Sequence, residues 1–192
     1  RSVIGDQTKG EVELKPGTDT PEVTTDTEAL KDLGGEIHGW QTVTVKLTVE
    51  KQEEPADKDE IAELVTGKKD DVLYLDLSLL RQINSEEPEA ITDTGSKVLE
   101  ITVTYDFTGK KDVTVYRKHG NTPAAALTGL TERPDGAFTD GTFYTDTVNG
   151  KVYIYASKFS TYAIGYTART SGSGSSGGGS STVYYTLTAT AG

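Results

Sequence analysis

Side chains that commonly perform catalysis are few in this sequence, and their spacing fits no familiar site. The chain has two histidines, His38 and His119, which stand before glycine in EIHGW and KHGN. Neither has the spacing of a metal-binding motif. The chain has no cysteine, which excludes thiol nucleophiles, thiolate metal sites and disulfides. We therefore predict that the protein is not an enzyme.

Carboxylates are abundant, but they occur as neighbours in polar runs, as at Asp70 and Asp71. Such runs usually form a solvated surface, because acid–base catalysis needs two carboxyls held in different environments. The stretches DKDE at 57–60 and TDTGS at 92–96 carry oxygen ligands of the kind that calcium prefers, without the twelve-residue loop of an EF-hand. Calcium is thus a candidate ligand, and we expect no other cofactor.

Tyrosines gather in the last third of the sequence and allow two interpretations. Tyr144, Tyr153 and Tyr155 are a candidate platform for a sugar ring, with Tyr162 and Tyr166 following. The same spacing fits cross-strand tyrosine pairs that stabilise a sheet. The second interpretation is the more common arrangement in β-sandwiches.

The elements that must position these residues are mainly strands. QTVTVKLTVEK, DVLYLDLSLLRQ and SKVLEITVTYDF each alternate apolar and polar residues, which predicts half-buried strands. Asn149 and Gly150 form the preferred pair for a two-residue hairpin turn. One helix is predicted over about 56–67, because Pro55 can begin it, acidic residues fill its first turn and Gly67 ends it.

These patterns predict an all-β protein: an antiparallel β-sandwich over residues 40–169, with one short helix at an edge. Residues 1–39 are polar, and we expect an extended N-terminal arm with a short strand at GEVELK. Residues 170–180 form a Gly/Ser linker, which orders nothing by itself.

The linker is followed by an isolated strand over residues 181–192. From Thr182 to Ala191 apolar and polar residues alternate. The apolar face carries Val183, Tyr185, Leu187, Ala189 and Ala191. A lone strand is not stable in water, because its backbone groups need a neighbouring ladder. It therefore completes its own sheet, opens a further module, or inserts into another copy of the chain.

The charge of the chain excludes some partners. Its formal net charge is −11, which opposes binding to nucleic acid and to anionic membranes. The sequence has no stretch long enough to cross a membrane, so we expect no membrane insertion. The chain starts at Arg1 and has no methionine, and we interpret it as a processed product or an excised fragment.

At KDVTVYRKHG, GKVYIYASKFSTYAIGY and DVLYLDLSLLRQI the sequence resembles a domain that recurs in large surface proteins of gut Firmicutes. The resemblance covers about Thr42 to Thr167, and the run from Phe159 to Ala163 is its most specific part. It implies an Ig-like fold without established activity, on the bacterial cell surface. It supplies no catalytic residues. In such proteins a Gly/Ser linker and a repeat module often follow, and YYTLTATAG resembles the opening of that module.

We therefore expect a non-enzymatic extracellular structural protein, a fibre or pilus-like subunit that donates its C-terminal strand to a neighbouring copy. Donated strands gain affinity from main-chain hydrogen bonds, and a head-to-tail contact propagates instead of closing. The alternative is an adhesin module that binds carbohydrate, from the host or the cell wall, and whose next repeat is missing. An intramolecular Lys–Asn or Lys–Asp isopeptide bond also remains open.

Overall fold

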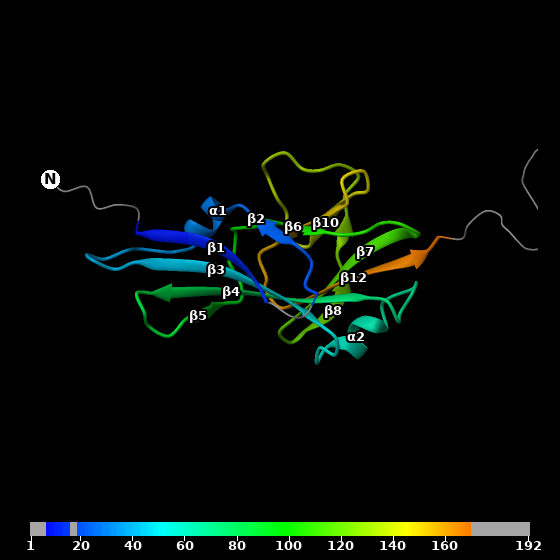
Figure 1. Ribbon diagram of the computed structural model, residues 1–192, viewed down its shortest axis with the longest axis horizontal. Coiled ribbons are helices and arrows are strands. Elements are labelled where there is room, and N and C mark those ends of the chain that lie inside the picture. Colours follow the sequence, from blue (N-terminus) through cyan, green and yellow to red (C-terminus); the bar gives the residue numbers. More distant parts are fainter. Residues whose placement is uncertain (1–6, 16–18, 170–192) are drawn as a thin grey trace, which may run out of the picture.

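The computed structural model describes residues 7–15 and 19–169 (Figure 1). The linker at 170–180 and the strand expected at 181–192, with the donor residues Val183, Tyr185, Leu187, Ala189 and Ala191, lie outside the described residues. The expected all-β class is confirmed, because the described residues form two packed sheets with two short helices.

The larger sheet has seven strands, six of them side by side and β5 beside part of β4. These are, in spatial order, β1 (Thr8–Leu14), β3 (Val43–Gln52), β4 (Leu73–Ile83), β12 (Thr161–Ala168), β7 (Lys110–His119) and β8 (Thr122–Ala126), with β5 (Glu89–Ile91). The smaller sheet is β2 (Val23–Thr25), β6 (Leu99–Thr104), β11 (Lys151–Ala156), β10 (Thr142–Asp146) and β9 (Thr128–Gly129). Most neighbouring pairs are antiparallel, whereas β1 with β3 and β9 with β10 are parallel.

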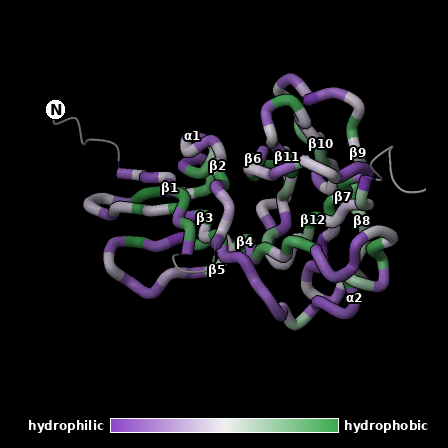
Figure 2. Tube along the Cα trace, turned by 45° about the vertical axis from the view of Figure 1, so that its right-hand side comes forward, coloured by the Kyte–Doolittle hydropathy of each residue, from purple (hydrophilic) through white to green (hydrophobic). Residues whose placement is uncertain are grey.

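The period-two patterns correctly predicted the core. In β3, β4 and β6 every second side chain is buried between the two sheets, as Leu47, Leu77 and Ile101 illustrate at 0% exposure. Each such side chain contributes about 1.5–3 kcal/mol by leaving water. Hydrophobic residues follow the strands in Figure 2, and most surface loops are hydrophilic. The core therefore follows from the alternation that a pleated strand imposes.

The N-terminal segment, expected as an extended arm with a short strand at GEVELK, contributes a strand to each sheet. Residues 8–14 form β1, paired in parallel with β3, and residues 23–25 pair with β6 in the other sheet. Between them lies α1 (Thr27–Lys31), a helix not predicted from the sequence, whose Leu30 is fully buried. The sequence did not predict this packing, because Gly10 interrupts the apolar pattern of β1. The missing side chain of Gly10 is also what lets α1 pack closely on the strand.

The helix expected over 56–67 is shorter than predicted. The helix α2 covers Lys58–Ala62 and buries Ile61. Val65 is also buried, beyond the end of the helix. The segment ends at Gly67, where a Cβ would lie 2.9 Å from the Cα of Thr167. Packing against β12 thus takes the place of a further helical turn.

The hairpin expected around Asn149 and Gly150 is confirmed, but its turn is longer than two residues. The last paired residues of β10 and β11 are Asp146 and Lys151. Gly150 has φ of +66°, whereas Asn149 does not adopt a positive φ. Instead the Asn149 backbone N–H and side-chain amide both donate to Asp146, at 3.0 and 2.7 Å. These bonds favour a four-residue turn.

Substitution of Gly10 tests whether the N-terminal segment belongs to the fold. An alanine Cβ there would lie 2.8 Å from Leu30 Cβ and would also contact the Thr27 carbonyl. We expect Gly10→Ala to lower the free energy of unfolding by about 1–3 kcal/mol, the usual cost of overpacking. Chemical denaturation measures it, with Lys9→Ala on the exposed side of β1 as the control. Equal stability of both variants would mean that β1 does not pack on α1.

Candidate functional site

The three tyrosines of the candidate sugar platform lie on one face of the smaller sheet. Tyr144 and Tyr153 are directly opposite each other on β10 and β11, with ring centroids 6.1 Å apart. Tyr155 follows on the same side of β11. However, Tyr155 is fully buried and Tyr153 is 8% exposed. The structure thus shows a cross-strand pair and a buried ring, and it leaves only Tyr144 partly accessible.

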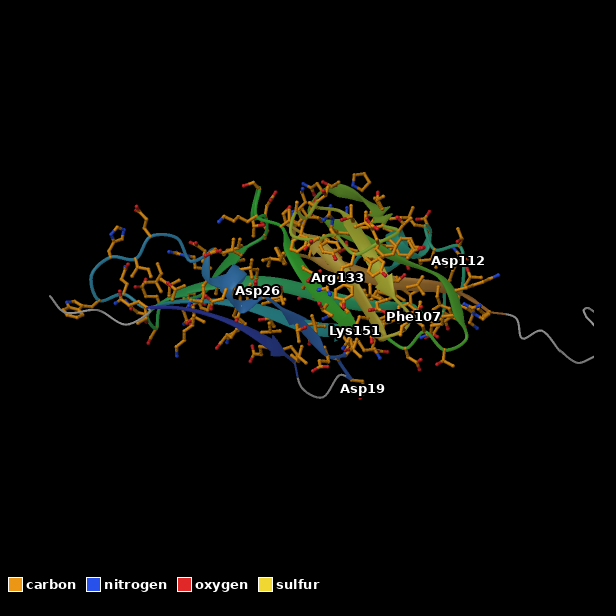
Figure 3. The ribbon with its side chains drawn as sticks, turned by 90° about the horizontal axis from the view of Figure 1, so that it is seen from above. Asp19, Asp26, Phe107, Asp112, Arg133 and Lys151 are labelled. Atoms are coloured by element: carbon orange, nitrogen blue, oxygen red, sulfur yellow. The ribbon has the colours of Figure 1, made fainter. Side chains whose placement is uncertain are left out.

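The loop at 130–141, between β9 and β10, covers this face. The Arg133 guanidinium lies over the ring of Tyr153 at 4.1 Å, and Figure 3 shows where Arg133 lies. Phe138 contacts the ring of Tyr155, with centroids 4.9 Å apart. These contacts occupy the ring faces that a sugar would need.

Glu100 of β6 fastens the covering loop. Its carboxylate accepts two hydrogen bonds from Arg133, at 2.8 and 3.0 Å, and one from the Tyr155 hydroxyl at 2.8 Å. Burial alone would raise the pKa of Glu100, but the bonds from Arg133 and Tyr155 outweigh it and lower the pKa. The charged form of Glu100 is therefore part of the folded structure.

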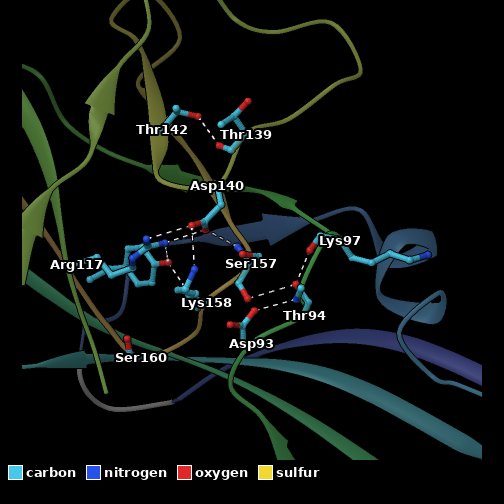
Figure 4. A network of polar contacts seen from close by, with 12 residues as sticks. Asp93, Thr94, Lys97, Arg117, Thr139, Asp140, Thr142, Ser157, Lys158 and Ser160 are labelled. Carbon is cyan, nitrogen blue, oxygen red and sulfur yellow. Dashed lines mark hydrogen bonds and ion pairs between the residues drawn. The ribbon is translucent and has the colours of Figure 1, made fainter. Parts of the chain in front are cut away.

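A second polar cluster centres on Asp140, at the end of the same loop (Figure 4). Arg117 of β7 donates to both oxygens of Asp140, at 2.8 and 3.1 Å. The backbone N–H of Ser157 donates at 2.8 Å, and Lys158 Nζ lies 3.6 Å away. Tyr162 completes the cluster, because its hydroxyl accepts from Arg117 and donates to the Lys158 carbonyl. The cluster joins β7, the covering loop and the turn between β11 and β12.

The electrostatics of this cluster indicate a structural role. Burial acts to raise the pKa of Asp140, but the hydrogen bonds from Arg117 and Ser157 outweigh it and lower the pKa to about 2. Asp140 is thus an anion at neutral pH. Lys158 Nζ lies 3.6 Å from Asp140, so this lysine–aspartate pair forms a salt bridge.

A small hollow of about 200 Å³ lies beside the cluster, between β8 and the turn at Lys158. Arg117, His119 and Lys158 line it, which would suit an anion if their charges were available. Asp140 already pairs with Arg117 and Lys158. The two cations of the hollow are therefore already engaged by one carboxylate.

The larger cleft, of about 570 Å³, lies between the loop at 105–110 and the turn at 147–150, next to Arg169. We call it the end cleft. Tyr105 and Phe107 meet edge to face in its wall, with ring centroids 5.2 Å apart. Lys110 lies over Tyr105 at 4.4 Å. Sequence reasoning missed this cleft, because its walls come from separate segments at 105–110, at 147–150 and at Arg169, and only the hairpin turn had a sequence signal.

The stretches considered for calcium form no cation site. In DKDE, Glu60 accepts the backbone N–H of Ala124 at 2.5 Å. In TDTGS, Asp93 accepts the N–H of Gly95 at 2.8 Å, an ordinary turn contact. Over residues 7–15 and 19–169, no three acidic or histidine side chains gather as metal ligands. The calcium hypothesis thus gains no support from these residues.

The edges of the sheets are the remaining candidate sites. In the larger sheet β8 is an unfavourable edge, because Pro123 has no N–H and the N–H of Ala124 already donates to Glu60. The smaller sheet ends in β2 and β9, which have three and two residues. The edge strand β1 has seven residues. It is the longest edge in the described part of the chain.

The fold and these sites define an all-β sandwich protein with a covered sheet face, an end cleft and one long edge strand. Comparisons with protein-family models, with curated proteins and with solved structures gave no match to this chain. In the described residues no helix has the length and apolar character that crossing a membrane requires.

The pKa of Asp140 predicts an acid-sensitive contribution to stability. Because the folded-state pKa is below the ordinary 3.8, the contribution is complete above about pH 4 and is lost as the pH falls towards 2. We expect Asp140→Asn to cost about 1–2 kcal/mol at pH 7 and to flatten the pH dependence of unfolding in that window. Denaturation from pH 2 to 7 measures both effects. The exposed Glu132→Gln, in the same loop, should behave like wild type; a parallel loss in both variants would contradict the role of Asp140.

Proposed function

We propose that the chain is a non-enzymatic structural module of a bacterial surface protein, located outside the cell and joined end to end with further copies. The observation that carries this proposal is the position of the two ends of the described fold. The chain enters the sandwich at one end of its long axis and leaves it at the other (Figure 1). Such an arrangement suits a module that spans distance between its neighbours.

The strand registers support this geometry. Thr8 of β1 pairs with Val43, and Val43 pairs with Ile83, so the starts of β1 and β3 lie at one end of the sheet. At the other end Ala168, the last residue of β12, pairs with Lys110. A pull on both ends would slide β1 along β3 and β12 along its neighbours. Their ladder hydrogen bonds would then carry the load together.

Copies would join by strand donation. The segment 181–192 has the alternating pattern of a strand and follows β12, whereas β1 is an edge strand at the opposite end of the sandwich. The donor would add to the edge formed by Lys9–Leu14 of the next copy. Since the donor segment follows the strand that ends at one end of the sandwich and the acceptor strand begins at the other, the contact would propagate into a fibre.

The second candidate is a module within a longer surface protein, in which segment 181–192 begins the next repeat. The opposite positions of the two ends favour this candidate equally, because tandem modules also connect end to end. The adhesin alternative loses its expected platform, since Tyr155 is buried and Arg133 covers Tyr153. Glycan binding would have to use another surface.

The two modes of joining are distinguished by the assembly state of residues 1–192 beside a chain that ends at Thr170. If strands are donated, light scattering and negative-stain microscopy should show a ladder of oligomers for the full chain and monomers for the shorter one. Leu187→Asp should abolish assembly, because it places a charge on the apolar face of the donor strand. Thr186→Asp, on the opposite face, is the matched control and should still assemble. Equal monomers throughout would exclude donation and favour the tandem module.

A further inference from the structure

Trp40, the single tryptophan of the chain, is displayed on the surface. It is 86% exposed and lies in the segment between α1 and β3. This segment is at the same end of the sandwich as the start of β1 (Figure 1). A single exposed apolar residue needs no explanation by itself. Trp40 is notable because its turn is held by hydrogen bonds and because the end cleft lies at the opposite end of the sandwich.

The turn that carries Trp40 is fixed by hydrogen bonds. The backbone N–H of Gln41 donates to the His38 carbonyl at 3.1 Å, and the His38 N–H donates to the Gln41 side chain at 3.0 Å. Gly39 supplies a φ of +57°, and its carbonyl accepts from the Gln7 side chain at 3.2 Å. The indole is thus presented on an ordered turn, which lowers the entropy cost of using it in a contact.

The end cleft, at the opposite end, has the size to receive an indole. Its volume of about 570 Å³ is within the range of roughly 300–1,000 Å³ typical of binding pockets. Its apolar lining consists of the 91% exposed Val148 and the accessible parts of Phe107 and of Tyr105, which is 8% exposed, beside polar atoms of the two loops. Lys110 and Arg169 are also in its lining, and cations favour the face of an indole ring.

Charge also matches across the two ends. The cleft has two cations, Lys110 and Arg169, against one carboxylate, Asp106, which already accepts the N–H of Thr108 at 2.9 Å. The turn of Trp40 carries the acidic Glu36, 89% exposed. An incoming turn would therefore bring a carboxylate towards an excess of positive charge.

We propose that Trp40 of one copy inserts into the end cleft of the next copy. The occupant of the cleft is thus a second copy of this chain. The contact is heterologous, because Trp40 and the end cleft lie at different ends of the molecule. It therefore repeats along a line. It rests on the proposed end-to-end assembly, but it uses residues outside the donor strand. Tryptophan is a frequent anchor of protein interfaces, where its burial supplies much of the affinity.

Because the chain has one tryptophan, its fluorescence reports this contact directly. For the full chain at rising concentration, we expect a shift of the emission to shorter wavelength and protection from acrylamide quenching, in step with oligomer formation by light scattering. Trp40→Ala should weaken association by about tenfold or more. The variant should fold normally, since the side chain is exposed.

A charge exchange tests the partner surface. Glu36→Arg and Arg169→Glu should each weaken association, and the double variant should recover it, because the ion pair is restored with reversed signs. Lys97→Glu, in the exposed segment before β6, changes the net charge as Arg169→Glu does and should have no effect. Assembly with the tryptophan still exposed and quenchable would overturn this docking while leaving end-to-end assembly intact. Monomers at every concentration would overturn both.

Discussion

The last described strand, β12, holds the larger sheet in one piece. On one side its residues Thr161–Ile164 pair with β4, and on the other side it pairs with β7 along almost its whole length. Without β12 the sheet would separate into β1, β3, β4 and β5 on one side and β7 and β8 on the other. The hydrogen-bonded ladders of the larger sheet are therefore continuous only through β12. Its side chains Tyr162 and Ile164 are fully buried, which ties this ladder to the core.

The two polar clusters hold the loop at 130–141 and the turn before β12, which the strand ladders do not fix. Arg117 and Asp140 attach the covering loop to β7, and the Asp140 oxygen that receives the Ser157 N–H fixes the entry into β12. Arg133 and Glu100 attach the other part of the loop to the smaller sheet. Partly buried ion pairs of this kind add fixed geometry more than net stability. Here they keep the face of the smaller sheet closed.

The placement of these features is the basis of the proposed end-to-end role. The end cleft and the exit of the chain lie together, and the turn of Trp40 lies with the start of β1. A protein with complementary features at opposite ends forms open lines, whereas one with a self-complementary patch closes into a dimer. The net charge of −11 opposes unspecific sideways association between copies.

The sequence by itself determined the class of the fold, most strand positions and the buried faces, because alternation along one strand is a local property. The hairpin at Asn149 was equally local. Only the tertiary structure decided the role of residues 8–14 and 23–31, since the place of β1 depends on a parallel pairing with β3 and on Gly10, whose missing side chain lets α1 pack closely. It also decided that Tyr155 is buried, because the residues that cover it come from the loop at 130–141. Strand pairings and clefts form between segments that are distant in the chain, and local sequence patterns carry no information about such long-range contacts.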